Sequence, residues 1–186
     1  QRPTPELIAE TDHVIAYLAR HPSAGLTYTR PATPLTGHAD ASWETAASTS
    51  GWVVSWQGAV INWGSRKQKS IALSTCEAEI IALSEGAKDM VYFRKLVAGL
   101  GCGEAGPSSL ATDSQSARDV SYNPQHHDRM KHVQRRHFFV RDMVESFEIE
   151  VPFVRTADNV ADMFTKPMKN ANDFHKLRRI IMNESS

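Results

Sequence analysis

The sequence predicts a mixed α/β domain, because β-rich runs and amphipathic helical stretches alternate along most of the chain. Three extended runs come first, between Leu35 and Gly64. The longest helical segment follows at Ser70–Leu100, and shorter strands and helices alternate after it. The predicted order from Leu35 to Thr165 is β-β-β-α-β-α-α-β-α, and periodicity alone does not determine how the strands are ordered in a sheet.

The composition is typical of one globular domain. The chain has 186 residues, of which 41% are hydrophobic and 23% charged. Acidic and basic residues balance at 21 each, so the net charge does not indicate a nucleic-acid partner. Two cysteines, Cys76 and Cys102, cannot form a disulfide framework, and we therefore expect a reduced, intracellular and cytoplasmic setting.

No targeting or membrane segment is apparent. No apolar run approaches the ~18 residues of a membrane span, and the N-terminus lacks the pattern of a signal peptide. We therefore expect no membrane partner. Because the chain begins with Gln1 instead of Met, we also expect it to be part of a longer protein.

The first 34 residues are predicted to precede the main domain. Thr4–Arg20 has the spacing of a short helix, Leu26–Thr29 that of a short strand, and Arg30–Pro34, with two prolines, that of a connector. The apolar face of the helix consists of Leu7, Ile8, Val14, Ile15 and Leu18.

Three strands are predicted next, at Leu35–Trp43, Gly51–Gln57 and Ala59–Gly64. Gln57-Gly58 between the second and the third has the composition of a tight hairpin, so we expect an antiparallel meander. By the period of two, one face of the first strand is polar. It carries Thr36, His38, Asp40 and Ser42.

The central helix is predicted from an apolar stripe and from signals at both of its ends. Ser74 followed by Glu77 is a capping-box pattern, and a glycine-rich stretch from Gly99 to Gly103 ends the helix. At 100° per residue, the core-facing stripe consists of Cys76, Ile80, Leu83, Ala87, Met90, Val91 and Val97.

The two carboxylates near the start of this helix face different sides. Glu77 projects with Ser84 and Lys88 on a face that resembles a solvent-exposed one, whereas Glu79 lies beside the apolar stripe. A carboxylate at the edge of a buried face needs a partner, for which a metal ion and a hydrogen bond at the helix start are both candidates.

The second half of the chain is predicted to alternate strands and helices. Pro152 places its last strand at an edge of the sheet. The predicted elements are a strand at Ser109–Asp113, helices at Ser114–Tyr122 and Lys131–Ser146, a strand at Ile149–Arg155, a compact helix at Asp158–Thr165 and a basic helix at Ala171–Met182.

Four acids, Asp40, Glu79, Asp113 and Asp162, are candidate metal ligands, although each has an ordinary alternative. Asp40 also fits a solvated sheet face, and Asp113, at a strand end that meets a helix, also fits an N-cap. Asp158 suits the N-cap of the next helix, which leaves Asp162 without a capping role. Together with Glu79, these acids have the chemistry that oxygen-preferring Mg²⁺ requires.

Five segments in this order closely resemble the ribonuclease H domain of copia-type LTR retrotransposon Pol polyproteins: GHADASW, STSGW, INWGSRKQKSIALSTCEAEIIAL, ATDSQSA and TADNVADMFTKP. The resemblance covers roughly Thr4–Met168, and its most specific parts are Trp63–Leu83 and the closing ADNVADMFTKP. Residues Thr4–Pro34 resemble the connection that follows the reverse transcriptase. The resemblance therefore implies residues 1–34 as a tether, 35–168 as the ribonuclease H domain and 169–186 as a basic C-terminal helix and tail.

The resemblance implies a ribonuclease H-like fold with a five-stranded mixed sheet flanked by helices. It implies Asp40, Glu79, Asp113 and Asp162 as both the catalytic residues and the ligands of two Mg²⁺ ions, which Mn²⁺ can replace. It also implies hydrolysis of the RNA strand of an RNA–DNA hybrid during reverse transcription, with no small-molecule cofactor, and a virus-like particle as the place of action. Two features depart from the family: Ser42 stands where an Asp is usual, and residues 154–157 hold none of the loop histidines found in many cellular ribonucleases H.

Two other clusters of side chains are candidate binding sites. A zinc site at His126, His127, His132 and His137 is disfavoured, because the spacings place successive histidines on different helix faces. The basic helix around Arg135 fits either a solvated face or a surface that contacts phosphates. The residues expected to contact nucleic acid are Arg66, Lys67, Lys69, Ser114, Gln115, Arg135 and Arg136.

Two functions of other kinds compete with the hybrid ribonuclease. One is a domesticated or inactive remnant that binds nucleic acid or a protein partner without cleaving, which the presence of all four acids disfavours. The other is a DNA-cutting relative with the same fold, such as an integrase, which the residues of the motifs disfavour.

Overall fold

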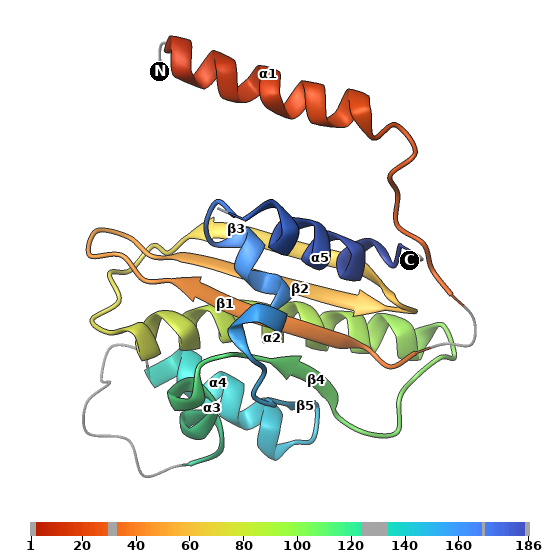
Figure 1. Ribbon diagram of the computed structural model, residues 1–186. Coiled ribbons are helices and arrows are strands. Elements are labelled where there is room, and N and C mark those ends of the chain that lie inside the picture. Colours follow the sequence, from red (N-terminus) through yellow and green to blue (C-terminus); the bar gives the residue numbers. More distant parts are fainter. Residues whose placement is uncertain (1–2, 30–32, 124–133, 169, 185–186) are drawn as a thin grey trace.

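The computed structural model describes residues 3–29, 33–123, 134–168 and 170–184, without the side chains of Gln134, Arg135 and His137. A five-stranded sheet with the order β3-β2-β1-β4-β5 forms its centre (Figure 1). The strands are β1 (Thr36–Ser42), β2 (Thr49–Trp56), β3 (Ala59–Lys67), β4 (Ser108–Ala111) and β5 (Ile149–Glu150). Because β1 is antiparallel to β2 but parallel to β4, the sheet is mixed, which confirms the predicted fold class.

Helices cover both faces of the sheet (Figure 1). On one face lie α2 (Thr75–Gly99), α3 (Gln115–Tyr122) and α4 (Gln134–Glu145). On the other lie the 3₁₀ helix η3 (Val160–Phe164) and α5 (Ala171–Met182). Successive residues of β2 point to opposite faces, so Trp52 and Val54 pack with α2 while Val53 packs with η3 and α5.

The predicted hairpin between β2 and β3 is confirmed. Gln57 has φ 53° and Gly58 has φ 86°, the left-handed pair of backbone conformations that a two-residue turn between twisted strands requires. The strand that follows extends to Lys67, three residues beyond the predicted end, and carries Arg66 and Lys67 with it.

Helix α2 begins as its capping pattern predicts. The Ser74 hydroxyl accepts a hydrogen bond from the Glu77 backbone N–H at 3.2 Å, and the Glu77 carboxylate accepts one from the Leu73 N–H at 2.8 Å. The prediction that Glu77 faces solvent is wrong, because its side chain folds back over the helix start and is buried there. Of the predicted stripe, Ile80, Leu83, Ala87, Met90 and Val97 are buried in the core, and Cys76 and Val91 pack partly buried against it.

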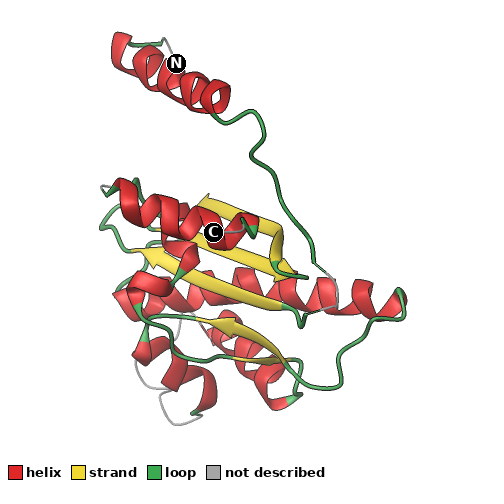
Figure 2. Cartoon of the chain, turned by 45° about the vertical axis from the view of Figure 1, so that its right-hand side comes forward, coloured by secondary structure: helices red, strands yellow, loops and turns green. Residues whose placement is uncertain are grey.

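The N-terminal helix α1 (Pro5–Arg20) forms as predicted but lies beyond α5, away from the sheet (Figures 1 and 2). None of its residues is buried. The strand predicted at Leu26–Thr29 is wrong: this stretch is an extended connection whose Thr27 and Thr29 N–H groups donate to the Met182 and Gln57 carbonyls. Among the described residues, no helix is both long and apolar enough to cross a lipid bilayer.

Two predicted elements of the C-terminal half differ from the structure. The strand predicted at Ile149–Arg155 is regular only over Ile149–Glu150, although β5 lies at the sheet edge as predicted. The compact helix predicted at Asp158–Thr165 consists of two short 3₁₀ helices, η2 (Thr156–Asp158) and η3. Asn159 caps η3 by accepting from the Ala161 N–H, so the capping role predicted for Asp158 is wrong.

Candidate metal centre

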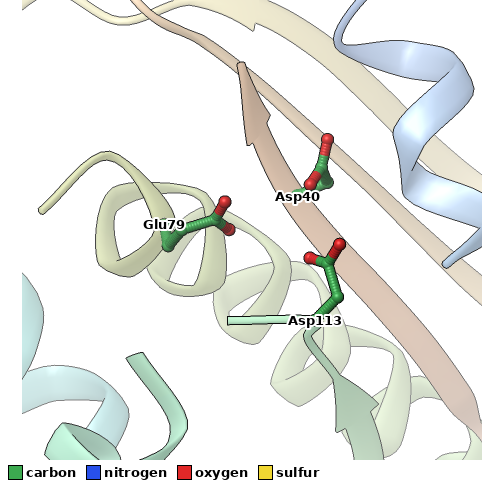
Figure 3. Close-up of side chains that lie close together, drawn as sticks. All are labelled: Asp40, Glu79 and Asp113. Carbon is green, nitrogen blue, oxygen red and sulfur yellow. The ribbon is translucent and has the colours of Figure 1, made fainter. Parts of the chain in front are cut away.

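Three of the four predicted acids meet at one point between the sheet and helix α2 (Figure 3). Asp40 lies on β1, Glu79 on the first turns of α2, and Asp113 just beyond the end of β4. One carboxylate oxygen of each lies within 4.8 Å of the others. The parallel pairing of β1 with β4 brings the carboxyl end of β4 beside Asp40, which explains why Asp113 reaches the same point.

Burial and mutual repulsion perturb two of these carboxylates. Burial raises the pKa of Glu79 to about 9, and the charges of Asp40 and Asp113 add to the effect. Burial also raises the pKa of Asp40 to about 6, against a hydrogen bond from Thr165 that lowers it. Three carboxylates at such short range repel one another when they are ionised, and a bound positive charge would compensate this repulsion.

The arrangement fits a divalent cation. Glu79 Oε2 is buried and has no hydrogen-bond partner among the described residues. A cation at this atom would offset the free-energy cost of burying the oxygen without a partner. The ligand atoms are all carboxylate oxygens, the donor type that Mg²⁺ and Mn²⁺ prefer over softer metals.

The fourth predicted acid, Asp162, lies nearby but outside the three-carboxylate cluster. It is buried on η3, and its Oδ1 forms an ion pair with Lys166 Nζ at 2.5 Å. Its charge nevertheless raises the pKa of Asp40, so the two carboxylates are close enough to repel. Lys166, half exposed, partly neutralises the cluster and lowers the pKa of both Asp40 and Glu79.

Asn159 and Thr165, which the sequence analysis did not single out, bind the η3 segment to the cluster. Asn159 is fully buried and donates to the Ala39 carbonyl and to Asp113 Oδ1, both at 3.2 Å. The Thr165 hydroxyl lies 2.6 Å from Asp40 Oδ2, to which it donates. With Lys166, both residues belong to the family-specific TADNVADMFTKP run, so that run was the signal that could have found them.

Gly51 allows this segment to approach the sheet. It pairs with Asp40 across β1 and β2, and a Cβ at this position would lie 2.7 Å from Thr165 Cγ2 and 2.8 Å from the Ala161 carbonyl oxygen. Only glycine leaves room for η3 directly beside Asp40.

Four of the residues predicted to contact nucleic acid line one groove of about 190 Å³: Arg66, Lys67, Lys69 and Arg136. The Arg136 guanidinium donates to Ser70 Oγ across this groove, and Arg66 stacks over the Trp52 ring at 5.4 Å. Lys67 is paired with Glu44 at 3.1 Å.

Ser114 and Gln115 begin α3 immediately after Asp113, where Ser114 caps the helix and Gln115 bonds to Asp119. The Arg135 side chain lies outside the described residues. The candidate zinc ligands also lie outside the described residues. His126, His127 and His132 are in the undescribed stretch, and the side chain of His137 is not described.

In the absence of metal, the protein is expected to lose stability as the pH rises. Folding raises the pKa of Glu79 from its ordinary 4.5 to about 9. Between these values the folded state retains a proton that the unfolded state has released, so stability is greatest below the lower value and falls through the window. Thermal unfolding in chelator should show a decrease of roughly 5 °C or more between acid and alkaline ends of this range.

Glu79→Gln is the matched variant for this measurement, because it removes the titrating group and keeps the side-chain shape. It should flatten the pH dependence. An unchanged slope in the variant would contradict the origin of the effect at Glu79.

Sequence comparison relates the chain to retrotransposon proteins. It is 36% identical over 134 residues to the Pol polyprotein of transposon TNT 1-94 from Nicotiana tabacum, matching 72% of this chain. It is 32% identical over 171 residues to that of transposon RE1 from Arabidopsis thaliana, matching 89% of this chain. The chain covers only 10% and 12% of these two polyproteins, respectively. No protein-family model matches the chain.

Structural comparison relates the fold to ribonuclease H domains. The N-terminal RNase H domain of Rv2228c from Mycobacterium tuberculosis aligns with a TM-score of 0.52 at 16% identity, covering 78% of this chain and 96% of that one. LC11-RNase H1 in complex with an RNA/DNA hybrid aligns with a TM-score of 0.52 at 12% identity, covering 70% and 93%. The chain therefore belongs with the Pol polyproteins of retrotransposons and has the ribonuclease H fold, the resemblance that its motifs predicted.

Proposed function

We propose that this domain hydrolyses the RNA strand of RNA–DNA hybrids in a reaction that depends on divalent metal ions. The observation that carries the proposal is the cluster of Asp40, Glu79 and Asp113, held at 4.8 Å or less within a ribonuclease H fold. Two ions of Mg²⁺ or Mn²⁺, when bound, supply an activated water and neutralise charge on the phosphate and on the leaving 3′-oxygen.

Each residue of the site has a distinct part in this proposal. Asp40, at the centre of the cluster, would hold the ions when they are bound, and Thr165 orients its carboxylate through the 2.6 Å hydrogen bond. Glu79 and Asp113 would be further ligands, and Asp162 would be a fourth once its carboxylate is free of Lys166. The Lys166 ammonium would then be a positive charge beside the phosphate.

Supporting evidence for the substrate comes from the relatives. A structural neighbour was solved with an RNA/DNA hybrid, and the sequence relatives are retrotransposon Pol polyproteins. We infer that the biological step is removal of template RNA during reverse transcription, inside the cell and within a virus-like particle. The hybrid would be distinguished from duplex DNA by its 2′-hydroxyls across a shallow minor groove.

The test is a cleavage assay on end-labelled RNA–DNA hybrid, with duplex RNA and duplex DNA of the same sequence as controls. We expect cutting of the RNA strand of the hybrid alone, in Mg²⁺ or Mn²⁺, and none in excess chelator. Binding of the hybrid without cleavage would support the inactive remnant, and cutting of duplex DNA would support the integrase-like alternative.

The groove that Arg66, Lys67, Lys69 and Arg136 line is proposed to contact the phosphates of the hybrid. Replacing both Arg66 and Arg136 by Ala should weaken binding and reduce the slope of log affinity against log salt by roughly one unit per lost contact. Lys95→Ala is the control, because Lys95 is exposed and lies roughly 24 Å from Glu79 along α2. An unchanged salt slope in the double variant would assign the groove to an ordinary solvated surface.

We also propose that residues 1–34 tether the domain to an upstream reverse transcriptase. Helix α1 has no buried residue, and the side chains of its apolar face are about half exposed or more, including Leu7 at 49% and Leu18 at 62%. Such a face is typical of a surface that a neighbouring domain covers.

The tether predicts that a protein extended through the upstream polymerase binds or cleaves the hybrid better than this chain does. Leu18→Asp should reduce that gain in the extended protein and leave the activity of the shorter one unchanged. Equal activity of the two lengths would rule out this role.

A further inference from the structure

We propose that the groove between α1 and α5 binds an unpaired stretch of the nucleic-acid strand that leaves the carboxylate site. The groove has a volume of about 630 Å³, and its third wall is the segment that follows Asp162. The nature of the strand rests on the proposed function, whereas the binding of unpaired nucleotides is a separate property of this surface.

The charge of the groove suits a polyanion. Its lining includes two permanent cations, Arg20 and Lys166, and three histidines, His13, His21 and His175. None of the described residues that line it is acidic, although the chain as a whole carries as many acids as bases. A lining with positive and no negative side chains attracts phosphate groups.

Aromatic rings run along the same groove in an unbroken series. The Tyr17 ring lies 4.6 Å from that of His21 and 5.8 Å from that of Phe174, which in turn lies 5.5 Å from the ring of His175. Tyr17, His21 and Phe174 are each only half-buried. Partly exposed rings beside cations are the elements that single-stranded nucleic-acid sites use, because every base has a face that can stack.

The groove and the carboxylate site share a neighbouring residue, Lys166. Lys166 lines the groove and also pairs with Asp162 Oδ1 at 2.5 Å, and Met163 of the lining is the residue after that acid. A strand that passes Asp162 therefore meets the groove next. Inside a duplex, neighbouring base pairs cover both faces of each base, so a base that stacks on these rings belongs to an unstacked, single-stranded stretch.

Helix α1 is held in place as a wall of this groove. Its Tyr17 hydroxyl accepts a hydrogen bond from the Arg178 guanidinium at 2.9 Å, and Arg178 is also bonded to Glu184 at 2.9 Å. The groove side of α1 carries His13, Tyr17 and Arg20, while Leu7, Ile15 and Leu18 lie on another face, and Val14 lies at the border of the two. Binding of nucleic acid therefore leaves most of the proposed tether surface free.

The experiment compares a blunt RNA–DNA hybrid with the same hybrid bearing a single-stranded extension, RNA in one arm and DNA in the other. Binding is measured by fluorescence anisotropy in chelator, so that no hydrolysis is needed. We expect the extension to increase the affinity of the unaltered chain roughly five-fold or more. Arg20→Ala and Phe174→Ala should remove this gain without changing the affinity for the blunt hybrid.

Two further variants isolate the cause. Phe174→Tyr keeps an aromatic ring and should retain the gain, and Arg179→Ala, which removes an exposed cation of α5 outside the groove, should retain it as well. If Phe174→Ala lowers the thermal midpoint, the exposed Arg20 still tests the site with the fold intact.

The inference is overturned if the unaltered chain binds blunt and extended hybrids equally, or if Arg20→Ala weakens both to the same extent. A gain from the extension in a chain that cleaves no hybrid would support the groove and contradict the proposed function. Cleavage of the hybrid without any gain in affinity from the extension would support the proposed function and contradict the proposed groove.

Discussion

Replacing Asp40 by Asn is expected to reduce hybrid cleavage roughly 10³-fold or more, because it removes several kcal/mol of charge-dependent stabilisation at the centre of the site. The charges of Asp113 and Asp162 raise the pKa of Asp40, and the charge of Asp40 in turn raises the pKa of Glu79. Asn keeps the shape of the side chain and an oxygen that can accept from Thr165, so the fold should remain intact.

The measurement combines hybrid cleavage in Mg²⁺ and Mn²⁺ with thermal unfolding of the same preparations. Asp142→Asn, an exposed aspartate of α4, is the matched control and should cleave as the unaltered chain does. Cleavage by Asp40→Asn at the unaltered rate, with a folded protein, would show that the metal centre has been placed at the wrong residues.

Substitutions of the two glutamates at the start of α2 are expected to affect cleavage very differently. Glu79→Gln removes a ligand and should reduce cleavage at least 10²-fold, while raising the thermal midpoint of the metal-free protein because a buried, repelled carboxylate is lost. Glu77→Gln should retain most activity, because the amide oxygen can still accept from the Leu73 N–H.

Loss of the cap altogether costs only about 1 kcal/mol, so even an imperfect replacement at Glu77 should leave a folded, active domain. Each variant is assayed for cleavage and unfolding with and without Mg²⁺. Activity lost in Glu77→Gln and kept in Glu79→Gln would assign the metal-site glutamate to the other side of the helix.

Several features of this chain were predictable because they depend on residues close together in sequence. The turn at Gln57-Gly58 needs only two residues that tolerate positive φ, and the start of α2 needs only Ser74 and Glu77 at their capping spacing. The buried stripe of α2 follows from the 3.6-residue period, which also placed Glu79 beside the core.

Two of the errors arose where distant segments decide the outcome, and the error at Glu77 is local. The stretch Leu26–Thr29 has the composition of a strand, but its backbone donors bond to the end of α5 and to the β2–β3 turn, so it joins no sheet. Glu77 lies on a face with lysines, yet it is buried because its own carboxylate closes over the helix start. Residues near Asp162 form 3₁₀ turns because Asn159 binds both β1 and Asp113.

The sequence by itself predicted most of the local elements, the family-specific motifs and the four candidate acids. Only the tertiary structure decided that three of them meet, that Lys166 holds the fourth apart, and that Thr165 orients Asp40. The physical reason is range: caps, turns and helical faces depend on neighbours within one or two turns, whereas these contacts depend on the β3-β2-β1-β4-β5 order and on burial, which raises the pKa of Asp40 and Glu79.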